Sequence, residues 1–163
     1  MRRSDREVTD RGEIVQMLLR CEALSLAFGG ETPYVVPLSF GVVRQGERLT
    51  LYMHCAPEGE KLERMAADPR VAFAAYRSGP LTEAPVACGY STDYESVCGS
   101  GVLRRVLGDE RRTGLEAIMA HYAPGRRFAF APDALDGVTV LRLDVTALTG
   151  KRRVAQACAQ QTP

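Results

Sequence analysis

Two alternating segments joined by a short turn, and followed at once by a helix, constrain the fold of this chain more than any other feature. Hydrophobic side chains alternate along residues 34–43 and again along residues 49–54, with Gln45-Gly46 as the turn between them. A short helix is expected next, at residues 58–67, because Asp68-Pro69 stops it. This order predicts a β-hairpin whose second strand leads directly into a helix N-terminus.

The first strand of this hairpin is apolar on both faces. Tyr34, Val36 and Leu38 alternate with Val35 and Pro37, so neither face is polar. A strand of this kind lies in a core on one side and is covered by a ligand or a partner subunit on the other. We therefore expect a large flat cofactor or a second subunit against its outer face.

The rest of the chain alternates between short strands and two longer helices. A capping box, Asp10 with Glu13, predicts a helix over residues 11–20, and the spacing of apolar side chains predicts another over residues 109–122. Further strands are expected at residues 22–28, 71–76, 96–106 and 138–145, and residues 77–94, rich in Gly, Pro, Ser and Thr, are expected to form a loop or a broken edge strand. Six strands joined mostly by tight turns predict a mainly β fold with peripheral helices, an antiparallel barrel.

Composition excludes several classes of protein. The net charge is +1, from 21 basic and 20 acidic residues, which gives no footprint for nucleic acid or for an anionic membrane. The chain contains no apolar run long enough to cross a membrane, and its first residues lack the apolar segment of a secretory signal. We expect a cytoplasmic protein with one domain at residues 1–153 and a C-terminal tail at residues 154–163.

The five cysteines are scattered and form no Cys-x-x-Cys pair. Neither a disulfide framework nor a structural metal site is therefore expected, and no metal ligand set is assigned. Cys21, Cys88 and Cys98 are expected to be small hydrophobic residues of the core. Cys55 differs from these three because it adjoins His54.

The candidate chemistry centres on the segment HCAPEGEK, residues 54–61. A helix N-terminus attracts anions, and Lys61 in its first turn adds a positive charge that a bound phosphate would explain. The alternative is that Lys61 is a solvated residue paired with Glu58 or Asp68. His54 at the strand end is either a hydrogen-bonded structural residue or a proton donor or iron ligand.

The other basic residues are either phosphate ligands or solvated side chains, and the second histidine is considered with them. Lys151, Arg152 and Arg153 follow the last strand and are in a position to reach a phosphate, as are Arg104 and Arg105, unless these side chains are merely solvated. His121, on a helix beside Tyr122, is expected to be structural. No order of Ser, His and Asp indicates a hydrolase, and no Gly-x-Gly-x-x-Gly motif indicates a dinucleotide fold.

Several of these segments, taken in order, resemble one known family. The chain is similar to the pyridoxamine 5′-phosphate oxidase-like superfamily, in the branch of flavin-nucleotide-binding proteins that includes the 5-nitroimidazole reductases called Nim proteins. The resemblance covers roughly residues 1–153, in collinear order. It rests on the segments MRRSDREVTD, PYVVPLSFG, LTLYMHCAPEGEKLERM, DPRVAF, YESVCGSG, IMAHY and TGKRR.

The resemblance implies a six-stranded antiparallel split β-barrel that forms a homodimer and binds one FMN per subunit interface. It implies that the phosphate lies near Lys61 and that His54 contacts the substrate or delivers a proton. It also implies contacts with the flavin ring and its chain from a wider set of residues: Val36, Pro37, Leu38, His54, Cys55, Ala56, Ser96, Lys151 and Arg152.

The activity that the resemblance implies is the reduction of a nitro compound through bound flavin, by an oxidoreductase of nitroreductase type. Haem or a deazaflavin replaces FMN in some members of the family. Two other functions therefore stay open: a non-catalytic flavin- or haem-binding protein, and an enzyme of the pyridoxamine-phosphate oxidase type.

Overall fold

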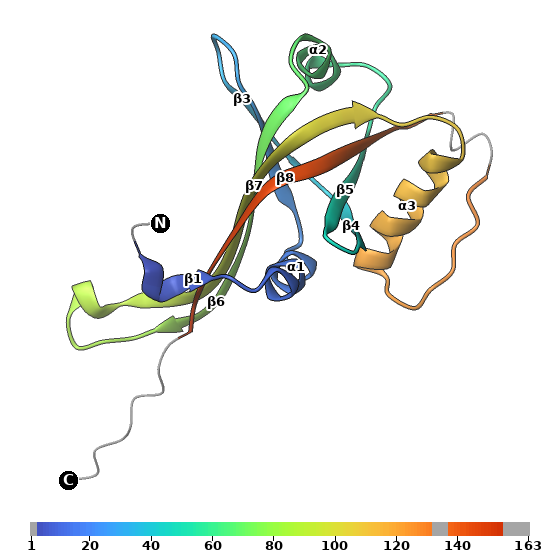
Figure 1. The fold of residues 1–163 in the computed structure, drawn as a ribbon. Coiled ribbons are helices and arrows are strands. Elements are labelled where there is room, and N and C mark those ends of the chain that lie inside the picture. The colour runs from blue at the N-terminus through green and yellow to red at the C-terminus, as the bar shows by residue number, and fades with distance from the viewer. Residues whose placement is uncertain (1–2, 132–136, 155–163) are drawn as a thin grey trace.

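A single curved sheet dominates the protein. A computed structural model describes residues 3–131 and 137–154. Within these residues the sheet has eight antiparallel strands: seven follow the order β3-β2-β6-β7-β8-β5-β4, and β1 pairs with β8 outside that path (Figure 1). No helix of the described part is long and apolar enough to cross a membrane. The predicted mainly β class with peripheral helices is confirmed.

The elements have the following bounds. The strands are β1 (Glu7–Val8), β2 (Leu24–Phe28), β3 (Tyr34–Leu38), β4 (Phe40–Gln45), β5 (Arg48–Cys55), β6 (Arg70–Thr82), β7 (Ser91–Arg105) and β8 (Thr139–Arg153). The helices are α1 (Arg11–Leu19), α2 (Glu60–Ala67) and α3 (Asp109–Tyr122), with short 3-10 turns at Ser4–Arg6 and Ala87–Gly89.

The described strands outnumber the six predicted ones for a structural reason. Residues 34–45 form two strands instead of one, because β3 pairs with β2 whereas β4, after Ser39, pairs with β5. One extended segment therefore supplies both edges of the sheet. The sheet is not closed by hydrogen bonds, and only the chain at Ser39 joins its two edges. The other addition is the two-residue strand β1.

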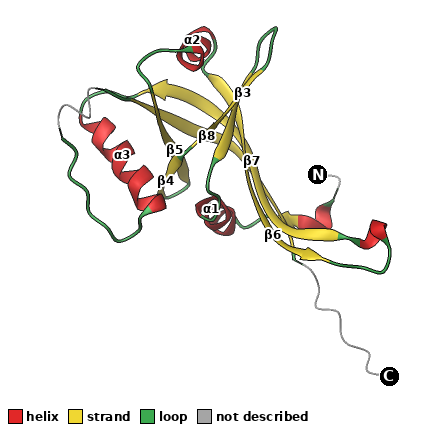
Figure 2. Ribbon diagram, turned by 180° about the vertical axis from the view of Figure 1, so that it is seen from behind, coloured by secondary structure: helices red, strands yellow, loops and turns green. Residues whose placement is uncertain are grey.

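The core lies inside the curve of the sheet and is completed by α1. Met17 and Leu18 of α1 are fully buried, and they pack with Phe40 of β4 and with inward-facing Leu and Val side chains of the long strands. Asp10 begins α1 as predicted, since its carboxylate accepts a hydrogen bond from the Glu13 backbone N–H. Figure 2 shows α1 and α2 at opposite ends of the barrel.

A second, smaller cluster lies under α3 on the outer side of β5. Gly41 makes this close approach possible, because a Cβ there would lie 2.3 Å from the backbone of α3. Tyr52 is buried in this cluster with Ile118 and Val140. The strand β5 is thus covered on both faces, which explains why residues 49–53 are all buried.

His121 fastens the end of α3 to the segment after α1, as its predicted structural role requires. Its Nε2 lies 2.9 Å from the carbonyl oxygen of Cys21, and its ring packs against Phe40 and Tyr122. The Tyr122 hydroxyl donates a hydrogen bond to the Glu22 carbonyl oxygen. These contacts hold α3 in place over β4 and β5.

The prediction of a loop or broken edge strand at residues 77–94 holds for the connection at residues 83–90 and for the irregular pairing between Ser78 and Leu81, but it missed the paired strand ends on either side. β6 continues to Thr82 and β7 begins at Ser91, so the two strands form a long hairpin that projects from the barrel (Figure 1). We call its outer part, residues 78–92, the arm. Glycine and proline indicated a break, but pairing with β7 keeps the chain extended.

Two further differences concern the strand and cysteine predictions. β8 runs to Arg153, well beyond the predicted end at residue 145. Cys21 is buried as predicted, but Cys88 and Cys98 are exposed, so their assignment to the core is wrong. The predicted tail lies outside the described residues from residue 155 onward.

Candidate functional site

The end of the barrel beside α2 gathers polar groups, several of which have no partner among the described residues. β5 ends at Cys55, and Gly59, with φ of +125°, lets the chain turn into the first residue of α2. Lys61, in the first turn of α2, and Arg105, at the end of β7, are both close enough to the thiol of Cys55 to lower its pKa. A thiol, an ammonium group and a guanidinium group therefore meet here.

Neither cation at this end is neutralised. Of the acidic residues expected to pair with Lys61, Asp68 pairs with Arg70, and among the described residues no carboxylate contacts Lys61 or Arg105. Burial raises the pKa of the Cys55 thiol, whereas Lys61 and Arg105 oppose that rise. The alternative in which Lys61 forms a surface ion pair is therefore not what the structure shows.

Thr139 adds an unsatisfied hydroxyl group to the same end. It lies directly opposite Cys55 in the β5–β8 pairing, and it is only 1% exposed. Its Oγ1 has no hydrogen-bond partner within the described residues. A buried hydroxyl without a partner is costly, so the group is suited to a ligand. A small cavity of about 60 Å³ lies beside Thr139 and is also lined by Arg105.

The strand predicted to face a cofactor lies at this end too. Val36 and Leu38 are half-buried against the core, whereas Val35, 58% exposed, and Pro37 face outward. Arg64 of α2 donates a hydrogen bond to the Thr32 carbonyl oxygen and lies over the ring of Tyr34. β3 is an edge strand, where proline, which has no N–H, is tolerated.

His54 lies on the other face of β5 from Cys55. It follows Tyr52 on the side that α3 covers, but it lies beyond that cover and is exposed. Its imidazole makes no hydrogen bond with any other described residue. The expected alternative of a hydrogen-bonded structural histidine is therefore not observed. Ala56, which follows the strand, is exposed as well.

The remaining predicted site residues lie at the α1 end of the sheet. Ser96 and Lys151 are directly opposite each other on β7 and β8. Arg152 donates hydrogen bonds to the carboxylates of Glu95 and Glu13, and Arg20 binds the same two carboxylates. Hydrogen bonds from Arg20 and Arg152 lower the pKa of Glu95. Arg152 is thus already engaged by two carboxylates within the chain.

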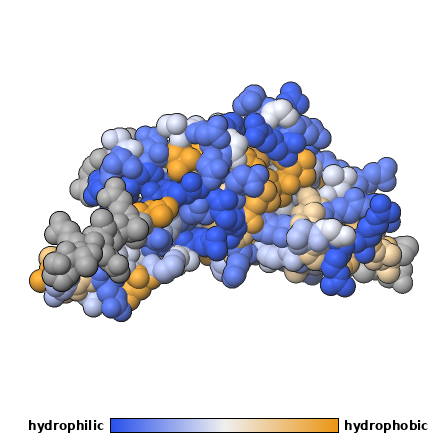
Figure 3. Space-filling model, turned by 90° about the horizontal axis from the view of Figure 1, so that it is seen from below, coloured by the Kyte–Doolittle hydropathy of each residue, from blue (hydrophilic) through white to orange (hydrophobic). Residues whose placement is uncertain are grey.

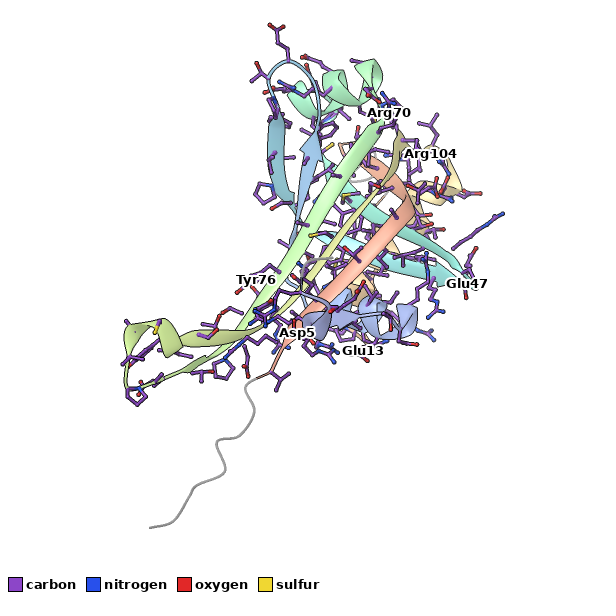
Figure 4. The ribbon with its side chains drawn as sticks, turned by 60° about the vertical axis from the view of Figure 1, so that its left-hand side comes forward. Asp5, Glu13, Glu47, Arg70, Tyr76 and Arg104 are labelled. Carbon is purple, nitrogen blue, oxygen red and sulfur yellow. The ribbon has the colours of Figure 1, made fainter. Side chains whose placement is uncertain are left out.

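The two groups of predicted residues are therefore not brought together in one chain. Ser96 lies near one end of the barrel part of β7, and Arg105 lies at the other, about 30 Å of strand away. Figure 4 shows this separation, with Arg70 and Arg104 labelled toward one end and Tyr76 and Glu13 toward the other. That distance is longer than one FMN molecule.

The structure also separates two arginines that the sequence left equivalent. Arg104 pairs with Glu110 and Asp144 on the α3 side of the sheet, whereas Arg105, one residue on, faces Cys55. Sequence reasoning missed Thr139 altogether, since nothing in its neighbourhood marked the residue as polar and buried. No group of three or more His, Cys, Asp or Glu residues in the described part is arranged to hold a metal ion.

The sequence profile described as "Pyridoxamine 5'-phosphate oxidase" matches residues 10–152 of the chain. A search of curated proteins finds no similar sequence. Among solved structures, a candidate 5-nitroimidazole antibiotic resistance protein from Bacteroides thetaiotaomicron VPI-5482 is 29% identical, with a TM-score of 0.77. That match covers 90% of this chain and 86% of the other.

Two further solved structures share the fold at lower identity. The FAD and heme binding protein from Mycobacterium smegmatis is 20% identical with a TM-score of 0.78, covering 92% of this chain and 74% of that one. The flavocytochrome Anf3 from Azotobacter vinelandii is 16% identical with a TM-score of 0.78, covering 99% of this chain and 75% of that one. At such identities the likeness concerns the fold alone.

Proposed function

Because the chain belongs to the pyridoxamine 5′-phosphate oxidase family, we propose that it binds FMN and reduces a nitro compound of the 5-nitroimidazole type. One observation carries this proposal: Lys61 and Arg105 are not neutralised by any described carboxylate, and they lie beside the unsatisfied hydroxyl of Thr139. Such a set fits a phosphate, which takes up positive charge and accepts hydrogen bonds.

Different residues of the α2 end contact different parts of this cofactor. Lys61 and Arg105 bind the phosphate, and Cys55 and Ala56 lie next to it, at the end of β5. The flavin ring lies against the edge strand of Val36, Pro37 and Leu38, on which Pro37 faces outward and Val36 and Leu38 face the core. FMN, when bound here, supplies the electrons that reduce the acceptor.

The separation of the two residue groups supports the proposal of a homodimer with the cofactor at the subunit interface. Ser96 and Lys151 lie too far from Lys61 to contact the same FMN within one chain. A two-fold axis that passes midway between the two ends lays the α1 end of one copy over the α2 end of the other. Ser96 and Lys151 then serve the cofactor of the second copy.

His54 is the residue that we assign to proton delivery. Its ring is exposed, makes no hydrogen bond with another described residue and lies two residues beyond Tyr52, at the edge of the area that α3 covers. An imidazole in this position is able to orient a nitro oxygen and to give it a proton as the nitro group is reduced. Similarity to the Bacteroides thetaiotaomicron protein supports this choice of acceptor.

The first experiment is an absorbance spectrum of the purified protein, followed by denaturation and chromatography of what is released. Flavin bands with FMN released support the proposal, and a colourless protein that also refuses added FMN contradicts it. The enzymatic test is reduction of a 5-nitroimidazole with a nicotinamide donor, by wild type and by His54→Ala. We expect the variant to keep FMN and to lose at least tenfold in turnover. Turnover of pyridoxamine 5′-phosphate instead would identify the other enzyme type.

Haem binding is the second candidate, and the unpartnered imidazole of His54 is the observation that favours it. A neutral histidine is a common axial ligand of haem iron. This function predicts a Soret band in the same spectrum that disappears in His54→Ala. A flavin spectrum that is unchanged in His54→Ala would exclude it.

A further inference from the structure

The imidazole of His121, at the C-terminal end of α3, touches two other parts of the fold. Its Nε2 lies 2.9 Å from the carbonyl oxygen of Cys21, in the segment that follows α1. The centre of its ring lies 4.5 Å from that of Phe40 on β4 and 4.7 Å from that of Tyr122. The ring therefore joins the end of α3 to β4 and to the end of α1.

These contacts determine which nitrogen of the neutral ring carries the proton. A carbonyl oxygen only accepts hydrogen bonds, so Nε2 donates to Cys21 and Nδ1 is left as the acceptor. Nδ1 is buried and has no hydrogen-bond partner within the described residues. A proton added at Nδ1 would create a buried N–H without an acceptor on a ring with a full positive charge, and both are costly to bury.

No acidic side chain of the described residues offsets that charge. Burial lowers the pKa of His121 from its ordinary value of 6.5, and the hydrogen bond to the Cys21 carbonyl oxygen opposes this effect. The other charged side chains of α3 lie mostly in its first turn, at the far end of the helix. The remaining titratable groups nearby are engaged elsewhere or exposed: the Cys21 thiol and the Tyr122 hydroxyl donate to carbonyl oxygens, Arg20 binds Glu13 and Glu95, Arg44 lies near Glu47, and Glu22 and Glu116 are exposed.

Tyr122 connects the same elements as His121 but does not titrate near neutral pH. Its hydroxyl accepts a hydrogen bond from the Phe40 backbone N–H and donates one to the Glu22 carbonyl oxygen. One turn earlier, Ile118 packs in the cluster under α3, so the last turn is able to move while the rest of the helix stays in place. Figure 3 views the molecule from below, the side on which α1 and the end of α3 lie, and most of its surface there is hydrophilic. A displaced last turn would therefore lie in water.

We propose that His121 is a pH-sensitive anchor: its neutral ring holds the last turn of α3 against β4 and the end of α1, and protonation at Nδ1 releases that turn. The cause is that the docked ring excludes the proton, whereas the ring of a released turn is in water and takes up a proton near its ordinary pKa.

The direction of the effect follows from the lowered pKa of the docked ring. The contribution of the anchor is complete above the ordinary value of 6.5 and is lost as the pH falls below it. Because α3 covers the outer side of β5, the strand that ends at His54 and Cys55, the cover of that strand becomes dependent on pH. The inference goes beyond the proposed function and does not depend on a bound flavin.

Hydrogen exchange of the full chain, followed by mass spectrometry, measures the release. We compare about pH 7.5 with about pH 5.5, on either side of the ordinary pKa of histidine, and correct for the intrinsic pH dependence of exchange. Peptides from residues 115–122 should exchange at least about fivefold faster at the lower pH, because a released turn loses its protection. Peptides from α1, residues 11–19, should not change. Equal protection of residues 115–122 at both pH values would overturn the proposal.

Two variants separate protonation of the ring from a general loosening of the helix end. His121→Gln keeps an N–H donor for the Cys21 carbonyl oxygen but has no group that titrates, so its exchange in residues 115–122 should be the same at both pH values. Tyr122→Phe removes the hydroxyl that bridges Phe40 and Glu22 and keeps His121, so exchange should rise at both pH values and remain faster in acid. An acid-induced increase of equal size in wild type and His121→Gln would refute the role of His121.

Titration of the ring by NMR tests the sign of the effect directly. The chain contains two histidines, so His54→Gln leaves a single imidazole, that of His121. Its midpoint should lie below the ordinary value of 6.5. A midpoint above this value would mean that the rings of Phe40 and Tyr122 hold the imidazolium in place, and the proposal would then be wrong.

Discussion

The two ends of the barrel differ in whether their charged residues are paired with charges of opposite sign. At the α1 end, Glu13 and Glu95 are matched by Arg20 and Arg152 in a closed network that joins α1 to the sheet. At the α2 end, Lys61 and Arg105 meet a thiol and no carboxylate of the described chain. The comparison shows that a count of basic residues does not locate an anion site, because most of these cations are already used by the fold.

The largest expected effect is on stability, at the α1 end. Glu95→Ala removes the less exposed of the two carboxylates that Arg20 and Arg152 share, which is 15% exposed, so the free energy of unfolding should fall by about 2–3 kcal/mol. Denaturant unfolding measures this change. Glu60→Ala, which removes the exposed pair with Arg64, should cost less than about 0.5 kcal/mol. Equal losses in the two variants would show that the network is no more than a set of surface pairs.

The next effect is on ligand affinity, at the α2 end. Lys61→Ala removes a charged donor to the phosphate and should weaken FMN binding by about 1.5–3 kcal/mol, roughly tenfold to over a hundredfold. Its free energy of unfolding should stay within about 0.5 kcal/mol of wild type, since Lys61 forms no ion pair with any described residue. Arg48→Ala, at the far end of the same strand β5, is the control and should bind FMN normally. Fluorescence titration of flavin decides, and unchanged affinity in Lys61→Ala would refute the phosphate assignment.

Acid should act on the α1 end first. The pKa of Glu95 is lowered in the folded protein, chiefly by the hydrogen bond from Arg20, so its ionised form stabilises the fold at any pH above its ordinary value of 4.5. This contribution is lost as the pH falls from about 4.5 through the lower folded-state pKa. Glu95→Gln has no carboxylate to protonate at this position. The free energy of unfolding of this variant should therefore depend less on pH between 5 and 3. Parallel pH curves for the two proteins would contradict this reading.

The smallest effect concerns the Cys55 thiol. Burial raises its pKa, and Lys61 limits that rise, so Lys61→Ala should raise the pKa further. Alkylation of Cys55 by iodoacetamide at mildly alkaline pH should slow by a factor of about two to ten, because the thiolate is the reactive form. Peptide mass spectrometry follows the rate, and Cys88, exposed on the arm, provides an internal control whose rate should not change.

Local patterns in the sequence predicted most of the elements that build the fold. The alternation around Gln45-Gly46 gave the β4–β5 hairpin, and the capping box at Asp10 gave the start of α1. The paired strands of the arm were missed because its glycines and prolines indicate a break, whereas these strands are held extended by each other across the hairpin. The division of residues 34–45 at Ser39 was missed for a similar reason, since the two halves pair with different strands.

The candidate site was predicted in part. Lys61 and Cys55 meet at the start of α2, as their closeness in sequence suggested, and His54 is exposed at the end of β5. Ser96, Lys151 and Arg152 lie at the other end of the sheet, where Arg152 is engaged by carboxylates from α1 and β7. Thr139 became visible only through its pairing with Cys55 and its burial.

What the sequence by itself determined is the set of strands and helices and their class, because hydrophobic period, caps and turns act over a few neighbouring residues. Only the tertiary structure decided which charges remain available to a ligand. Arg104 and Arg105 are adjacent in sequence and identical in chemistry, yet one faces Glu110 and the other faces Cys55. That choice depends on strand register and on the bulge at Ser100 and Gly101, which are set by partners far away in the chain.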